Sequence, residues 1–277
     1  MTKDHKSGVF VWFGLLIFLL LIGVIVSICY YSANEYQNQG YSMVEKLISP
    51  KIFIINLDRK PERYTYVSDQ LDKFGFKDYQ RWPAVDGFNS DLETLMSYGL
   101  ASILCDRRGL AGCAASHIDV WRHIVKEKIE WTLILEDDAY FHPRFPELFR
   151  GYTEKIPKDT KIAYLGYCGV DEDLGKEAVV KYAPMCMHAY LISYEGAQHI
   201  LNNIGNIENP IDIELLRYFK KDQSNGCYIF NGNAFVNGIR PHDYKENNSG
   251  RCQFEGIVYQ NRQELGSTIH EVNTVYF

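Results

Sequence analysis

The sequence predicts an α/β domain, in which a mostly parallel β-sheet is flanked by helices, preceded by one transmembrane helix. Short apolar, β-branched runs alternate with segments whose apolar residues recur at helical spacing, which is typical of a helix-covered sheet. The 277 residues, of which 46% are hydrophobic, are enough to bury a sizeable core. Residues 9–31 carry no charge, which favours a membrane span.

Residues 9–31 are predicted to form the membrane-spanning helix. As a helix they would be roughly 34 Å long, enough to cross a hydrocarbon core of about 30 Å. A cleaved signal peptide is the alternative, but its apolar region is normally shorter and ends at small residues, whereas this one ends at two tyrosines. Lys3 and Lys6 precede the span and Lys46 is the first basic residue after it, so the positive-inside bias puts residues 1–8 in the cytosol. The chain is then a type II membrane protein with its bulk in the lumen of the endoplasmic reticulum or Golgi of a eukaryotic host.

Beyond the span, composition predicts a stem and one folded domain. Residues 32–49 are polar and rich in tyrosine, as expected of a stem, and residues 50–277 are of a size that fits one α/β domain. The net charge of −6 and the absence of a basic stripe exclude nucleic acid as an expected partner. The sequon at Asn247 agrees with a lumenal surface loop and predicts a glycoprotein.

Cysteine usage leaves two interpretations open. Six cysteines lie outside the span, an even number that permits disulfides in an oxidising lumen, although buried thiols would give the same count. No CxxC or HExxH motif occurs, so structural zinc is not expected. The six are Cys105, Cys113, Cys168, Cys186, Cys227 and Cys252.

The elements of the domain follow in order from local patterns. Residues 51–57 predict a buried strand, and the following segment, 58–76, fits a helix with Pro61 near its first turn. Residues 80–87 predict a second strand ending in an Asp86-Gly87 turn. The remaining predicted elements are a helix at 109–128 with Trp121 in its buried face, strands at 131–138, 161–167 and 188–193, a helix at 193–204 capped by Ser193, and a strand-and-loop region with Asn-Gly turns after residue 221.

Three consecutive carboxylates, Glu136, Asp137 and Asp138, form the end of the strand predicted at 131–138. Such a cluster is costly unless a cation or hydrogen-bond donors neutralise it, and a hard divalent metal holding a phosphate is the usual reason for one. In helix-covered parallel sheets ligands bind beyond the carboxyl ends of the strands, where these acids lie. A solvated acidic turn is the alternative. The cluster indicates an enzyme that acts on a nucleotide-linked substrate.

Five motifs occur in an order that resembles glycosyltransferase family 25, which includes lipopolysaccharide-type sugar transferases and collagen galactosyltransferases. They are INLDRKPER, PAVDG, GLAGCAASHIDVW, LILEDDAYF and HAYLISYEGAQHIL, between about residues 51 and 220. The resemblance implies a GT-A type, Rossmann-like fold and a divalent cation, Mn²⁺ or Mg²⁺. It also implies transfer of galactose or glucose from a UDP-sugar to a hydroxyl of a glycan or protein acceptor.

The resemblance also implies roles for particular residues. Glu136 and Asp138 correspond to the DxD element, with Asp138 on the metal and Glu136 or Asp137 contacting the ribose or a metal-bound water, while His242 is a candidate late metal ligand. The expected donor-binding set is Asn56, Asp58, Arg59, Arg63, Asp86, Gly87, Ser116, His117, Glu136 and Asp137. Plainer alternatives are a surface arginine pair at 59 and 63, an ordinary turn at 86–87 and a structural histidine at 117.

An inverting transfer needs a carboxylate within reach of the acceptor hydroxyl, on the face opposite the leaving group. Asp212 and Glu214 are the candidates, and a helix start enriched in acids is the alternative for both. Two other functions compete. A sugar nucleotidyltransferase would favour a Gly-rich loop near the first strand, and INLDRKPER has no glycine. A non-catalytic sugar- or nucleotide-binding membrane protein would be expected to lack the acidic cluster or the base, and both are present.

Overall fold

The computed structural model describes residues 20–32, 49–168, 174–221, 226–231 and 255–260, in two units, Met1–Leu47 and Ile48–Phe277. In the first unit residues 20–32 are helical, and none of the helices in these described ranges is long and apolar enough to cross a bilayer. The predicted tail 1–8, the first part of the predicted span 9–31 and most of the predicted stem 32–49 lie outside the described residues.

An eight-stranded sheet organises the second unit, with the strand order β2-β1-β3-β7-β5-β8-β6 and β9 paired to β5; β10 and β4 form a separate two-stranded sheet. The strands are β1 (Lys51–Asn56), β2 (Tyr79–Pro83), β3 (Trp131–Glu136), β4 (Ala139–Phe141), β5 (Ile162–Cys168), β6 (Val179–Lys181), β7 (Met185–Ser193), β8 (Cys227–Phe230), β9 (Glu255–Gly256) and β10 (Val258–Gln260).

The main sheet is mixed, which corrects the expectation of a mostly parallel one. Strand β1 pairs in parallel with β2 and β3, and β5 with β8, whereas β7 is antiparallel to both β3 and β5. The last seven residues of β7 are all buried. A strand buried on both faces has the same apolar pattern in either direction, so the pattern could not reveal this reversal. The parallel expectation holds for β2-β1-β3, the part that positions the site.

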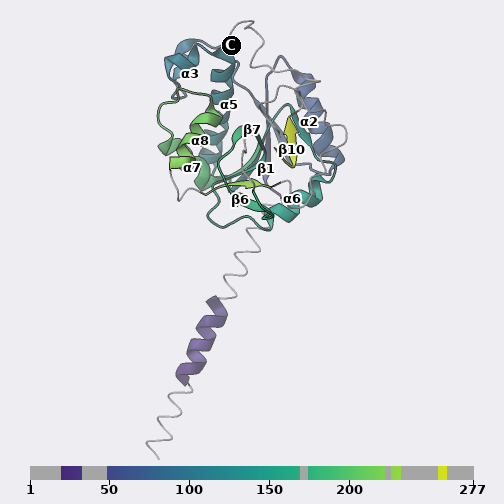
Figure 1. Ribbon diagram of the computed structural model, residues 1–277, viewed down its shortest axis with the longest axis vertical. Coiled ribbons are helices and arrows are strands. Elements are labelled where there is room, and N and C mark those ends of the chain that lie inside the picture. Colours follow the sequence, from purple (N-terminus) through teal and green to yellow (C-terminus); the bar gives the residue numbers. More distant parts are fainter. Residues whose placement is uncertain (1–19, 33–48, 169–173, 222–225, 232–254, 261–277) are drawn as a thin grey trace, which may run out of the picture. The chain divides into compact units, whose positions relative to one another are not determined.

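Helices cover both faces of the sheet, with α5, α7 and α8 together on one side and α2 and α6 on the other (Figure 1). Three predicted helices are confirmed. Pro61 is the first residue of α2. Helix α5 ends at Glu127, and the next residue, Lys128, has a left-handed backbone conformation. Ser193 caps α7, because its side chain accepts a hydrogen bond from the backbone N of Gly196 at 3.0 Å. The helices are α2 (Pro61–Lys73), α3 (Leu92–Met96), α4 (Ser102–Cys105), α5 (Arg108–Glu127), α6 (Phe145–Thr153), α7 (Tyr194–Asn203) and α8 (Ile211–Lys221).

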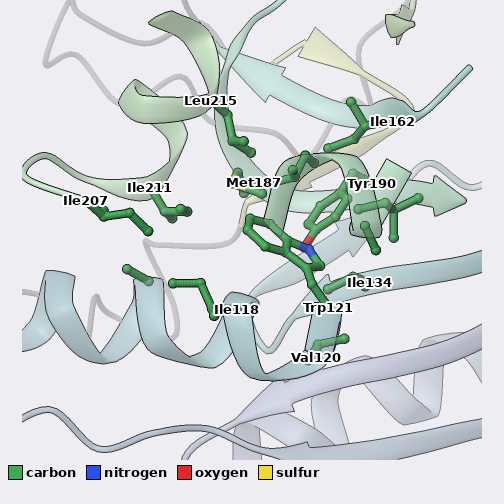
Figure 2. Close-up of a cluster of buried hydrophobic side chains, with 14 of the residues drawn as sticks. Ile118, Val120, Trp121, Ile134, Ile162, Met187, Tyr190, Ile207, Ile211 and Leu215 are labelled. Carbon is green, nitrogen blue, oxygen red and sulfur yellow. The ribbon is translucent and has the colours of Figure 1, made fainter. Parts of the chain in front are cut away.

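The core between α5 and the sheet is centred on Trp121, whose side chain is fully buried as predicted. Figure 2 shows Trp121 beside Tyr190 of β7, with Leu215 of α8 in the same cluster. The indole Nε1 donates to the Tyr190 hydroxyl at 2.9 Å, which satisfies the polar atom of each ring inside the apolar layer. A core aromatic of this kind is worth about 3–5 kcal/mol, and it fixes α5 against the sheet.

Candidate active site

A pocket opens where β1, β2 and β3 end, because parallel strands bring their carboxyl ends to one edge. The loop after β2 and the N-terminal half of α5 complete its wall. Most of the predicted donor-binding and metal residues line it, namely Arg59, Arg63, Asp86, Gly87, Ser116, His117, Glu136, Asp137 and Asp138. Asn56 and Asp58 do not.

A buried guanidinium neutralises two of the three acids. Arg63 Nη2 lies 2.7 Å from Asp137 Oδ1 and 3.4 Å from Asp138 Oδ2, and its side chain is 4% exposed. The alternative of a surface arginine pair is therefore wrong for Arg63. Burial raises the pKa of Asp137 to about 6, although Arg63 and a hydrogen bond from Asn56 act to lower that pKa. The acidic cluster is thus built into the pocket rather than exposed on a turn.

Arg63 has further donors to offer. Among the described residues, its buried Nε and Nη1 have no hydrogen-bond partner. An unsatisfied buried donor costs about 1–3 kcal/mol, and more when it is charged, so the arrangement favours a bound acceptor group. A planar guanidinium suits phosphate or carboxylate oxygens.

Asn56 holds the acidic cluster from behind the pocket. Its Nδ2 donates to Asp137 Oδ2 at 2.7 Å and to the carbonyl of Lys60 at 2.8 Å, and its Oδ1 accepts from Arg81 Nε at 2.8 Å. Asp58 pairs with the same Arg81. In this structure Asn56 therefore orients Asp137, and Asp58 orients Arg81. Arg81, which the sequence motifs did not single out, contacts both Asn56 and Asp58.

Arg59 and Asp86 come together at the rim of the pocket, 27 residues apart in sequence. Arg59 Nε donates to Asp86 Oδ2 at 3.0 Å, and Asp86 also accepts from the backbone N of Phe88 and from Asn89. Burial alone would raise the pKa of Asp86, but these hydrogen bonds outweigh it and lower that pKa. The Asp86 carboxylate consequently stabilises the turn through Phe88 and orients the guanidinium of Arg59.

Two glycines let the loop after β2 lie directly on α5. A Cβ on Gly112 would lie 2.6 Å from the carbonyl O of Val85, and one on Gly87 would lie 1.9 Å from that of Arg108. Ser116 stabilises this contact between the loop and α5, since its Oγ accepts from Val85 N at 2.8 Å and donates to Gly112 O at 2.6 Å. Gly87 and Ser116 thus shape the pocket wall by backbone packing.

A hydrogen-bonded chain runs from the core to the pocket. Tyr190, which accepts from Trp121, also bonds His117 Nδ1 at 2.9 Å, and His117 Nε2 lies 3.3 Å from Glu136 Oε1. The second oxygen of Glu136 accepts from Gln260 Nε2 at 3.3 Å. Glu136 is therefore oriented from two sides, toward α5 and toward β10.

A second cavity adjoins the first and shares Cys113, Glu136 and Gln260 with it. Asp212 lies in its wall, with Oδ2 accepting from Cys186 N at 3.1 Å and Oδ1 from Ile213 N at 2.9 Å. Each of these oxygens has a second lone pair that can accept another hydrogen bond.

Glu214, the other candidate base, has a different place. Its Oε1 accepts from Asn209 Nδ2 at 2.7 Å and from the backbone N of Asn209 at 2.9 Å, and it does not line the cavity. It therefore holds the loop before α8, which agrees with the alternative of an acidic helix start.

The structure decides part of the cysteine question. Cys168 and Cys186 form a disulfide between β5 and β7, while Cys105 and Cys227 are buried thiols. Cys252, the candidate metal ligand His242 and the sequon at Asn247 lie outside the described residues.

Sequence patterns missed two residues at the junction of the cavities. Gln260 is 124 positions from Glu136 and arrives through the pairing of β10 with β4, for which no local signal exists. Cys113 lies four residues before His117 on α5, a spacing that puts both on one helix face and could have been noticed.

Comparison with known proteins gives the chain its class. A protein of Drosophila melanogaster named "Glycosyltransferase 25 family member" is 30% identical over 56% of this chain and 28% of the relative. Mouse "Procollagen galactosyltransferase 2" is 26% identical over 57% of this chain and 28% of the relative. The chain thus spans less than a third of the length of these relatives, and it carries a glycosyltransferase domain.

The family comparison agrees with the motifs. Residues 49–183 match the sequence model described as "Glycosyltransferase family 25 (LPS biosynthesis protein)", the family that the motifs predicted. A crystal structure of "a glycosyltransferase involved in the glycosylation of the major capsid of PBCV-1" covers 76% of this chain and 94% of that chain, with 13% identity and a TM-score of 0.40. That likeness is too low to bear on the fold.

Proposed function

We propose that this chain transfers a hexose, galactose or glucose, from a UDP-sugar to a hydroxyl of a glycan or protein acceptor, with inversion at the anomeric carbon. The observation that carries the proposal is the guanidinium of Arg63, buried in the pocket of a family 25 domain with Nε and Nη1 lacking partners among the described residues. A diphosphate supplies the oxygen acceptors that these donors lack.

The two adjoining cavities support a model in which the first binds the UDP-sugar donor and the second binds the acceptor. The first holds Arg63, Arg59 and the acids at the strand ends, and the second holds Asp212. In the transfer, the acceptor oxygen attacks the anomeric carbon, its proton passes to the Asp212 carboxylate, and the bond to the diphosphate breaks with both electrons going to UDP. Backbone N–H groups of Cys186 and Ile213 keep that carboxylate in place.

The acidic residues suit a hard divalent cation. Carboxylate oxygens are the ligands that Mn²⁺ and Mg²⁺ prefer, and Asp138 and Glu136 would hold the ion from the end of β3, with His242 as a further proposed ligand. Bound there, the cation would neutralise charge developing on the diphosphate leaving group. Arg63, within ion-pairing distance of Asp138, stabilises the same negative charge from the protein side.

We also propose that residues 9–31 anchor the enzyme as a type II membrane protein with a lumenal catalytic domain. The uncharged run and the lysines before it support this orientation. The Cys168–Cys186 disulfide is consistent with an oxidising compartment.

The test is UDP release by the full chain in detergent from a panel of UDP-sugars, with Mn²⁺, with Mg²⁺ and with a chelator. The expected result is turnover of one sugar that the chelator abolishes and that Asp138→Asn loses. Asp91→Asn serves as the matched control, because Asp91 is an exposed N-cap of α3 and asparagine caps equally well. Nucleotide binding without turnover, unaffected by chelator or by Asp138→Asn, would instead support the non-catalytic binding protein.

A further inference from the structure

We propose that Cys113, His117 and Glu136 bind a borderline divalent cation, with Zn²⁺ as the reference ion, at the junction of the two cavities. The site shares Glu136 with the proposed Mn²⁺ site but goes beyond the proposed function, because its other donors are a thiol and an imidazole rather than oxygens, and binding is measurable without any transfer reaction. Within the described residues, these three side chains form the group whose potential ligand atoms all lie within 4.8 Å of one another.

The backbone brings the three ligands together. Cys113 and His117 are four residues apart on α5, so they project from one face of the helix. Glu136 ends β3 and turns its Oε1 toward that face. Since α5 and β3 are both rigid elements of the core, the site does not depend on a loop.

The distance between His117 and Glu136 fits coordination. Nε2 and Oε1 are 3.3 Å apart, longer than the 2.7–2.9 Å of a charge-assisted hydrogen bond. Two ligands that are each about 2.0–2.1 Å from a tetrahedral ion are separated by about 3.3 Å. The pair is therefore spaced as ligands of one ion would be, and the sulfur of Cys113 lies within 4.8 Å of a ligand atom of each.

A hydrogen bond to one ring nitrogen orients His117, as is usual for histidines that bind a metal through the other nitrogen. Its Nδ1 is bonded to the hydroxyl of Tyr190, which is itself fixed by Trp121, and this leaves Nε2 directed at the site. The Tyr190 oxygen has two lone pairs, so it can accept from both Trp121 Nε1 and a proton on Nδ1. In that tautomer Nε2 keeps its lone pair for the ion, and the outer hydrogen bond orients the ring.

The donor set selects the ion, and the cavities supply its fourth ligand. Thiolate with imidazole favours Zn²⁺ over Mg²⁺ or Mn²⁺, which prefer oxygen ligands. Three protein ligands with one open position are typical of reactive rather than structural zinc sites. Cys113 and Glu136 line both cavities, so an oxygen ligand, such as water or a hydroxyl, has access to that position from either side.

Cobalt binding by the metal-free full chain tests the site, because Co²⁺ replaces Zn²⁺ and shows a near-ultraviolet charge-transfer band only when a thiolate coordinates it. We expect the band in the wild type and in Cys105→Ser, its loss in Cys113→Ser, and its displacement by Zn²⁺. Cys105 is the matched control as a buried thiol outside the group. Glu136→Gln should weaken Co²⁺ binding by at least the roughly 10–100-fold that loss of an outer-shell partner costs.

A second measurement needs no variant. Zn²⁺ should protect Cys113 of the wild-type chain, a free and partly exposed thiol, from alkylation by iodoacetamide, read by peptide mass spectrometry with and without the ion. Absence of the cobalt band, its persistence in Cys113→Ser, or unchanged alkylation of Cys113 would each overturn the site. Absence of the band together with Mn²⁺-dependent transfer would overturn this inference and leave the proposed function standing.

Discussion

Nε2 of His117 lies 3.3 Å from Oε1 of Glu136, which joins α5 to the end of β3 where the two cavities meet. The same histidine is anchored through Tyr190 to Trp121 in the core. A side chain at the pocket is thus oriented by apolar packing several residues away. Changes in this layer should affect the site as well as stability, because ring orientation depends on that packing.

Asp212→Asn is expected to lower the transfer rate about 10²–10⁴-fold, because the amide cannot take the proton of the acceptor hydroxyl. Binding of the UDP-sugar should stay unchanged, since Asp212 lines the second cavity and not the first. Steady-state kinetics with donor and acceptor varied separately would check this. Wild-type rates in Asp212→Asn, or an equal loss in the control Asp91→Asn, would contradict the assignment.

Arg63→Met should destabilise the domain by about 3–5 kcal/mol, because it leaves Asp137 and Asp138 buried without their cation. Adding Asp137→Asn should recover part of that loss, which urea unfolding of the two single variants and the double variant would measure. The control is Arg144→Met, where the ion pair with Glu147 is exposed and the expected cost is about 0–1 kcal/mol. Similar costs for both arginines would show that Arg63 is not a buried partner.

Asp86 should contribute stability that depends on pH. Its pKa in the folded protein is lowered, so its contribution is present above the unfolded pKa of about 3.9 and is lost as the pH falls through the lower folded value. Asp86→Asn should therefore be less stable than wild type at neutral pH, and the difference should shrink below about pH 4. Urea unfolding between pH 3 and 7 would check this, with the exposed Asp78→Asn as control. A difference independent of pH would contradict it.

Reducing the Cys168–Cys186 disulfide should cost about 3 kcal/mol, the loop-closure value for a sequence separation of 18. It should also lower transfer, because the backbone N of Cys186 holds the Asp212 carboxylate. Urea unfolding and activity with and without reductant would measure both effects. The double variant Cys168→Ser/Cys186→Ser should no longer respond to reductant; if it responds as the wild type does, another group is responsible.

The strands and helices of the site were predictable because their signals are local. Pro61 at the start of α2, Ser193 at the start of α7 and the buried stripe of α5 each depend on a few neighbouring residues. The acids after β3 were predictable for the same reason, since the end of a strand can be recognised from its own residues. The family motifs added the order of these elements.

Long-range pairing decided the rest. The sequence by itself determined the alternation of elements, the family resemblance and most side chains that line the pocket at the ends of β1, β2 and β3, because periodicity and motifs lie within short segments. Only the tertiary structure decided that β7 runs antiparallel, that Arg81 supports Asn56, and that Gln260 reaches Glu136. The tertiary structure also decided that Asp212 lines the second cavity whereas Glu214, on the same turn of α8, bonds Asn209 instead. The physical reason is that strand direction, partner choice and the surroundings of a side chain depend on contacts between distant segments, which local sequence patterns do not encode.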